Sequence, residues 1–196
     1  MADGELTRPA GRTAPLTRDD LPLSGQAAFD RIAGDRGEVP WLFRFLLESP
    51  DLAYRVSHVG DFLRAGSSMP DDLREMLILA MSRHLDFQLE WSYHEQMARD
   101  AGVDAAVVDA LRDGGAPALG EREQACVDLA IAACDRTVSD AVFDAVAQRY
   151  DARFAVEVVV LAAFVVFMQL LVDALQVPLP EGVAELLPIA AGRSAQ

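Results

Sequence analysis

The segment from residue 154 to residue 175 constrains the fold of this chain most strongly, because it is almost free of polar groups. Residues 154–172 contain one charged residue, Glu157, and one amide, Gln169. A run of this length could span a membrane, which takes about 20 apolar residues. No arginine cluster flanks it and no second span accompanies it, so we predict a central helix that is buried on all sides, partly by another subunit.

The remaining sequence also favours helices. Of the 196 residues, 52% are hydrophobic, which suits a folded domain with a proper core rather than a disordered chain. Ala, Leu and Val dominate, and the alternation typical of strands is scarce. We therefore predict an all-α protein with a flexible N-terminal arm (1–23), a single helical domain (24–180) and a C-terminal tail (181–196).

The charge balance narrows the possible partners. A net charge of -14 argues against nucleic acid and anionic membranes, because the field of the protein repels polyanions. The sequence has no Lys and no Asn, which excludes a Schiff-base lysine, a P-loop and N-glycosylation and suggests a GC-rich bacterial genome. The N-terminus lacks an apolar run flanked by basic residues, so we expect a cytoplasmic location.

Two apolar stripes with helical spacing predict a helical hairpin. The first covers residues 73–84 and the second covers residues 87–101, with Asp86 as the expected N-cap of the second helix. Glu90 and His94 lie inside the second stripe. A carboxylate or an imidazole on a buried face costs free energy unless it has a partner.

The hairpin supplies such partners. Glu90 and His94 are four residues apart, so they can contact each other on one helix face. Glu75 and His94 are about equally far from a hinge near residues 83–86, roughly 14 Å along each helix axis at ~1.5 Å per residue. We therefore predict a cluster of Glu75, Glu90 and His94, provided that the two helices turn these faces toward each other.

The same hairpin resembles a known family. Arg74-Glu75 is followed after eleven residues by Phe87, then by Glu-Trp-Ser-Tyr-His at 90–94 and by Gly102. This pattern is similar to that of the carboxymuconolactone decarboxylase and alkyl hydroperoxidase D-like superfamily, over roughly residues 39–180. The resemblance implies an all-helical bundle that assembles as a homo-oligomer, either a trimer or a hexamer.

The hairpin departs from the redox branch of that superfamily. In that branch, two cysteines of a C-x-x-C motif precede the histidine, whereas Phe87 and Glu90 occupy those positions here. Thiol–disulfide exchange needs a thiolate beside a resolving cysteine, so we do not favour a peroxidase-type reductase. Cys126 and Cys134 fall outside the motif, and we interpret them as small buried hydrophobic residues. The decarboxylase branch resembles the Glu90-x-x-x-His94 arrangement.

We expect an enzyme of the lyase or isomerase class that decarboxylates or isomerises a small unsaturated carboxylate or lactone without a cofactor. His94 with Glu90 alongside would act as the acid, and Glu75 would return the proton. Arg83 would hold a substrate carboxylate, and no metal is expected because the cluster lacks a further histidine. The aromatic residues that would shape the pocket or simply pack are Phe87, Trp91 and Tyr93.

Three alternatives to this interpretation remain open. A natural-product tailoring enzyme, such as a cyclase or an isomerase, would need the same acid–base groups. A helical oligomer without catalytic activity could bind a small ligand or a partner protein. Finally, Glu90 and His94 could be a mutually satisfied buried pair that only stabilises a helix crossing.

Overall fold

The computed structural model describes residues 11–34 and 37–188. Within these ranges it contains helices and no strand, so the all-α prediction is confirmed. The chain divides into two compact units: unit 1 consists of Met1–Phe62 and Met168–Pro180, and unit 2 of Leu63–Phe167 and Glu181–Gln196.

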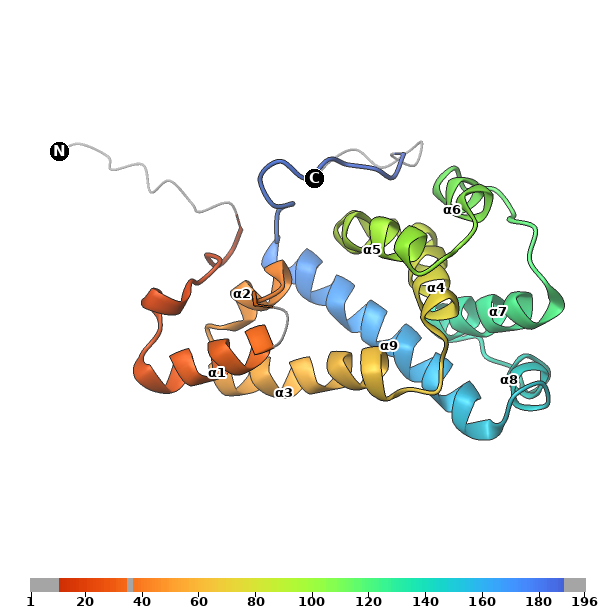
Figure 1. Ribbon diagram of the computed structural model, residues 1–196, viewed down its shortest axis with the longest axis horizontal. Helices are drawn as coiled ribbons and strands as arrows, with labels where there is room; N and C mark the ends of the chain where they lie inside the picture. The colour runs from red at the N-terminus through yellow and green to blue at the C-terminus, as the bar shows by residue number, and fades with distance from the viewer. Residues whose placement is uncertain (1–10, 35–36, 189–196) are drawn as a thin grey trace. The chain divides into compact units, whose positions relative to one another are not determined.

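Unit 1 is built on three helices, in which α1 and α2 both pack on α3 (Figure 1). Their bounds are Leu23–Ala33 for α1, Trp41–Leu46 for α2 and Pro50–Asp61 for α3. Ser49 is the N-cap of α3 and Pro50 is its first residue, a position that favours proline, and Pro22 is the N-cap of α1.

Part of the predicted N-terminal arm lies within the described residues. The Arg12 amide donates to the carbonyl of Leu175 at 2.8 Å, and the Leu16 amide donates to the carbonyl of Arg44 at 3.0 Å. A short 3-10 helix, Arg18–Asp20, follows, and Arg18 forms a two-bond ion pair with Asp30. Residues 1–10 of the predicted arm and residues 189–196 of the predicted tail lie outside the described residues.

Unit 2 is organised around α4, which contacts α5, α6 and α7. Residues 73–82 of α4 are all buried. The bounds in this unit are Asp71–His84 (α4), Gln88–Asp100 (α5), Ala105–Arg112 (α6), Glu121–Asp135 (α7), Asp140–Ala147 (α8) and Ala152–Leu175 (α9, whose last residues belong to unit 1).

The start of α4 is fixed by a buried carboxylate of α9. Glu157 accepts hydrogen bonds from the Ser68 amide at 2.7 Å and from the Ser68 hydroxyl at 2.6 Å. Pro70 then occupies the N-cap of α4, and two acidic residues lie in its first turn, where their negative charges interact favourably with the positive end of the helix dipole. A π-helix, Phe62–Gly66, precedes this connection.

The hinge between α4 and α5 differs from the prediction by one residue. Phe87, not Asp86, is the N-cap of α5. Asp86 adopts the left-handed conformation, with φ +53°, and its carboxylate accepts a hydrogen bond from Arg83 at 2.9 Å. An aspartate tolerates this conformation because its short side chain bonds locally, so it turns the chain here instead of capping the helix.

Among the described helices, α9 alone is long and apolar enough to cross a membrane, with a mean hydropathy of 2.6. A core helix passes the same test, and 39% of the apolar window is buried. Val156, Phe167 and Leu170 are 52%, 39% and 63% exposed. Within this chain, α4 rather than α9 is therefore the helix buried on all sides, and cover of the exposed α9 face by another subunit stays a prediction.

Candidate active site

The α4–α5 hairpin places Glu75 and His94 in direct contact. Glu75 lies in the second turn of α4 and His94 in the middle of α5, and these helices pack side by side (Figure 1). His94 Nδ1 is 2.6 Å from Glu75 Oε2, a short distance that is typical of a charge-assisted hydrogen bond. Glu75 and His94, which lie about equally far from the hinge along the sequence, are thus in direct contact in the structure.

Glu90 lies on the other side of the imidazole. His94 Nε2 is 3.5 Å from Glu90 Oε1, which is within ion-pair range but too long for a strong hydrogen bond. The ring therefore stands between two carboxylates, with Nδ1 bonded to one and Nε2 facing the other. Since Nδ1 is occupied, Nε2 is the nitrogen that can exchange a proton with a bound molecule.

Exposure increases across the cluster from Glu75 to Glu90. The side chain of Glu75 is 3% exposed, that of His94 is 16% exposed and that of Glu90 is 20% exposed. The cluster is therefore most exposed to solvent on the side of Glu90. Two cavities are described in unit 2. One, of about 250 Å³, is lined by residues of α4, α6 and α7, and the other, of about 350 Å³, by residues of α7 and α8. Neither is lined by Glu75, Glu90 or His94.

A buried arginine holds the far side of Glu75. Arg74 donates from Nε and Nη2 to Glu75 Oε1, at 3.2 and 3.1 Å. Its Nη1 donates to Asp71 Oδ1 at 2.7 Å and to the carbonyl of Arg64 at 3.0 Å. Each oxygen of the Glu75 carboxylate thus has its own partner, with Oε1 on Arg74 and Oε2 on His94.

These contacts move the pKa values of the acids in opposite directions. Burial raises the pKa of Glu75, but the hydrogen bond from His94 and the charges of His94 and Arg74 outweigh burial and leave that pKa below its ordinary value. For Glu90, burial raises the pKa, the charge of His94 lowers it and the charge of Glu75 raises it further, so the net shift is upward. Two carboxyl groups on one imidazole are thereby given different proton affinities.

His94 itself gains affinity for protons. Burial lowers the pKa of His94, whereas the hydrogen bond to Glu75 and the charges of Glu90 and Glu75 raise it, and the net shift is upward despite the charge of Arg64. Both shifts favour an ionised Glu75 bonded to a protonated His94. Glu90, with its raised pKa, is the carboxyl group best placed to take up or release the next proton.

Four of the predicted site residues lie outside this cluster. Arg83 pairs with Asp86 at 2.9 Å, about 12 Å along α4 from Glu75 at ~1.5 Å per residue. Trp91 is fully buried and donates from Nε1 to Glu95 at 2.8 Å, and Phe87 is 2% exposed, whereas Tyr93 is 40% exposed. Contact of these four with a substrate stays a prediction.

Both cysteines lie on α7 and are poor nucleophiles. Burial raises the pKa of Cys126 and of Cys134 to about 11 in each case. At neutral pH both thiols therefore stay protonated, and a thiol reacts mainly as its thiolate. Within the described residues, no group of three or more His, Cys, Asp or Glu side chains is arranged to hold a metal ion.

The sequence interpretation missed two arginines beside the cluster. Arg74 had a usable signal, because a buried arginine in an apolar helix needs an acidic partner, and the adjacent Glu75 offers one. No sequence signal pointed to Arg64, because its position depends on the π-helix Phe62–Gly66. Such π-turns are short irregularities that often occur at functional sites.

A known protein family matches the part of the chain that contains this hairpin. Residues 50–132 match the model of the carboxymuconolactone decarboxylase family, a segment that contains α4, α5 and all three clustered residues. Among proteins with curated functions, none matches the chain.

Solved structures extend the similarity to most of the chain. One is an uncharacterized peroxidase-related protein with an alkylhydroperoxidase AhpD core from Ralstonia eutropha JMP134, with 18% identity, a TM-score of 0.73, and coverage of 88% of this chain and 94% of that chain. Another is the debrominase Bmp8 without ligand, with 20% identity, a TM-score of 0.69, and coverage of 85% of this chain and 91% of that chain. A third is a cysteine-to-alanine variant of Bmp8 in complex with 2,3,4-tribromopyrrole, with 20% identity, a TM-score of 0.70, and coverage of 86% of this chain and 91% of that chain. The family match over residues 50–132 and the shared fold agree with the resemblance of the hairpin to the carboxymuconolactone decarboxylase and alkyl hydroperoxidase D-like superfamily.

Proposed function

We propose that this protein is a cofactor-independent acid–base enzyme that decarboxylates or isomerises a small unsaturated carboxylate or lactone. The observation that carries the proposal is the imidazole of His94 between two carboxyl groups whose pKa values are shifted in opposite directions. Acids and bases tuned by burial and by neighbouring charges are typical of sites that transfer protons.

Each member of the cluster would have a separate role. Ionised Glu75 holds the Nδ1–H of His94, so that Nε2 faces the substrate. In a decarboxylation, the electrons of the breaking C–C bond pass into the unsaturated system, carbon dioxide leaves and an enolate forms. Nε2–H then gives its proton to a carbon of that enolate. Glu90, in place of the Glu75 expected from the sequence, returns a proton to Nε2, because both oxygens of Glu75 are held by Arg74 and by His94 Nδ1. The net reaction consumes one proton and releases one carbon dioxide.

Isomerisation or cyclisation would use the same groups without loss of carbon dioxide. Glu90 would remove a proton from one carbon, and His94 would deliver a proton to another. A natural-product tailoring enzyme and a catabolic decarboxylase therefore differ in the substrate and not in the site. Release of carbon dioxide distinguishes the two reactions.

A thiol-dependent reaction has less support. The solved neighbours include a peroxidase-related protein and a debrominase, but at 18–20% identity they indicate the fold alone. In this chain Phe87 and Glu90 occupy the positions of the expected C-x-x-C cysteines. The raised pKa values of Cys126 and Cys134, about 11 in each case, also keep both thiols in the less reactive protonated form at neutral pH.

The proposal is tested by turnover of a panel of unsaturated carboxylic acids and lactones in D₂O, with NMR detection of deuterium incorporation and of carbon dioxide. His94→Gln should abolish both signals while the protein stays folded. His84→Gln is the matched control, because His84 also pairs with a carboxylate, that of Asp135 at 2.8 Å. Turnover that survives in His94→Gln would overturn acid–base catalysis by this cluster. Specific binding without turnover of any panel compound would support the non-enzymatic alternative.

We also propose that the protein is a homo-oligomer. The exposed face of α9 carries apolar side chains at alternating four- and three-residue spacing, namely Val156, Val160, Ala163 and Phe167. This spacing is typical of helices that pack along another helix. Sedimentation of the wild type and of Phe167→Glu tests the assignment, because a monomeric wild type would contradict it.

A further inference from the structure

We propose that Arg74 is a positioning residue of the candidate site, because its guanidinium holds one oxygen of Glu75 and thereby directs the other oxygen to His94 Nδ1. This inference rests on the proposed acid–base function and assigns a residue that determines which nitrogen of His94 reacts.

The guanidinium is fixed from both sides. Its side chain is 8% exposed, and a buried cation is tolerated only where its N–H groups are paired. On one side Nε and Nη2 bond to Glu75 Oε1. On the other side Nη1 bonds to Asp71 Oδ1 and to the Arg64 carbonyl, so the guanidinium cannot follow Glu75 if that carboxylate rotates.

This arrangement restricts Glu75 to one orientation. The terminal torsion of a glutamate is broad and roughly two-fold, so a carboxylate bonded only to His94 could rotate about that torsion and present either oxygen to the ring. Two N–H groups on Oε1 define the carboxylate plane and leave Oε2 for His94 Nδ1 at 2.6 Å. The neutral imidazole is then held with its proton on Nδ1 and with Nε2 available for chemistry.

The shape of the guanidinium matters here as well as its charge. Arginine presents several donors in a planar fork, whereas lysine presents a compact point charge. Only the fork can place Nε and Nη2 on one oxygen while Nη1 bonds elsewhere. Lysine at this position would keep the positive charge beside Glu75 and lose its fixed orientation.

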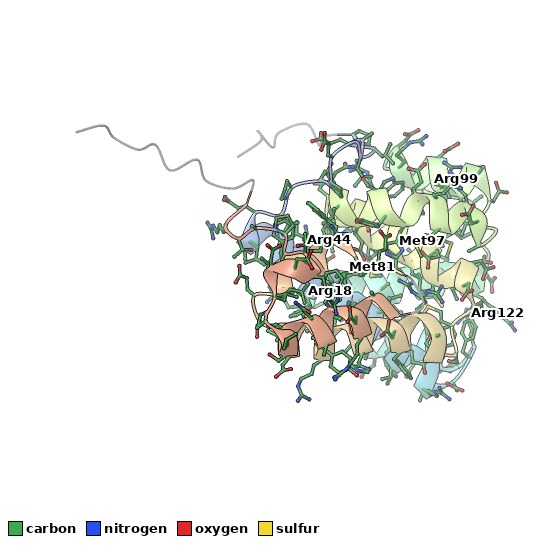
Figure 2. All side chains as sticks on the ribbon, turned by 60° about the vertical axis from the view of Figure 1, so that its left-hand side comes forward. Arg18, Arg44, Met81, Met97, Arg99 and Arg122 are labelled. Carbon is green, nitrogen blue, oxygen red and sulfur yellow. The ribbon has the colours of Figure 1, made fainter. Side chains whose placement is uncertain are left out.

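A second ion-pair network on the same hairpin offers a control. Arg99, on α5, pairs with Glu95 at 2.9 Å and with Asp109 at 3.0 Å, and it is labelled on that helix in Figure 2. Glu95 also accepts a hydrogen bond from Trp91 Nε1, and these contacts do not involve His94. Arg99→Gln therefore removes a comparable arginine without touching the candidate site.

The experiment measures the tautomer of His94 by ¹⁵N NMR of the free protein at a pH where the ring is neutral. Wild type and Arg99→Gln should show the proton on Nδ1. Arg74→Gln and Arg74→Lys should both show a mixture of the two tautomers. In turnover assays both Arg74 variants should lose about 10- to 100-fold in kcat, the range found when groups that orient a functional side chain are removed, with little change in KM.

Arg74→Lys separates positioning from charge. If lysine restores the wild-type tautomer and kcat, only the charge matters and the inference is wrong. An unchanged tautomer in both variants would also overturn it. If the variants do not fold, the inference can be tested on the wild type alone. The NMR signal of the Arg74 Nε–H group should then shift as His94 titrates. A signal that does not change during this titration contradicts the inference.

The tautomer measurement needs no substrate, so its failure is distinct from failure of the proposed function. Active His94→Gln protein would disprove catalysis by the cluster and leave the role of Arg74 in the tautomer standing. Inactive His94→Gln protein with an unaffected tautomer in the Arg74 variants would disprove the positioning role alone.

Discussion

Two histidines of the α4–α5 hairpin each pair with a carboxylate, and the two pairs differ mainly in their surroundings. His84, at the end of α4, contacts Asp135 at 2.8 Å, and these side chains are 34% and 45% exposed. His94 contacts Glu75 at 2.6 Å, and these side chains are 16% and 3% exposed. Only the second pair carries a further acid, Glu90, and a buried arginine on its carboxylate.

This difference shows what turns an ion pair into a candidate catalytic group. An exposed pair is screened by water and contributes little to stability or to proton affinity. A buried pair with an additional partner on each side has pKa values that depend on its neighbours and a fixed geometry. Burial and the surrounding partners thus distinguish the two histidines, whereas the pair itself does not.

Glu75→Gln should produce the largest effect, because it removes the charge that both His94 and Arg74 contact. We expect the free energy of unfolding to fall by about 3 kcal/mol, as for a buried ion pair that loses one partner, and turnover to disappear. Urea denaturation at neutral pH measures the loss. A loss below about 1 kcal/mol would mean that the pair is effectively solvated, like the pair of His84 and Asp135.

The pH dependence of stability should be the next largest effect. The raised pKa of His94 adds stability that is complete below the ordinary value of 6.5 and is lost as the pH rises through the folded-state pKa. The lowered pKa of Glu75 adds stability above its ordinary value of 4.5 that is lost as the pH falls through the folded-state pKa. The stability difference between wild type and His94→Gln should therefore be largest between pH 4.5 and 6.5.

The raised pKa of Glu90 affects stability in the same direction as the raised pKa of His94. Its protonated form is favoured in the folded state, so stability declines as the pH rises through that pKa. A stability difference for His94→Gln that grows steadily as the pH rises from 6.5 to about 9 would contradict the assigned directions.

Glu90→Gln should separate catalysis from stability. The 3.5 Å contact and the partial exposure of Glu90 predict a change in unfolding free energy within about 1 kcal/mol. Turnover should fall by about 10²- to 10⁴-fold, the usual contribution of a general acid or base, and the pH–rate profile should lose one limb. Unchanged turnover would remove Glu90 from the mechanism.

His84→Gln should have the smallest effect. Its pair with Asp135 is exposed, so the unfolding free energy should change by no more than about 0.5 kcal/mol and turnover should stay at the wild-type level. Chemical denaturation and the same turnover assay check both. If His84→Gln lost more turnover than Glu90→Gln, the conclusion that His94 and not His84 is the candidate catalytic histidine would be contradicted.

Much of the helical framework could be predicted from the sequence because its signals are local. Ser49-Pro50, Asp104 and Ser139 begin helices where their capping chemistry indicates. The contact of Glu75 with His94 followed from equal distances to the hinge. The left-handed Asp86 and the π-helix Phe62–Gly66 could not be predicted, since both depend on tertiary contacts.

The limits of the site prediction have a similar cause. Arg83 lies near the hinge, but distance along the chain does not say which way a side chain points. In the structure it pairs with Asp86, and its contact with a substrate stays a prediction. Arg74 occupies the position beside Glu75 on α4, and its direction depends on Asp71 and on the Arg64 carbonyl. The two compact units also have no counterpart in composition or linker signals along the sequence.

The most direct test of the central claim is an NMR titration of the three histidines in the wild type and in Glu75→Gln. We predict that His94 titrates above its ordinary pKa of 6.5 in the wild type and that its pKa falls in Glu75→Gln. A wild-type His94 that titrates at or below 6.5, or that ignores the loss of Glu75, would contradict a coupled acid–base cluster in this hairpin.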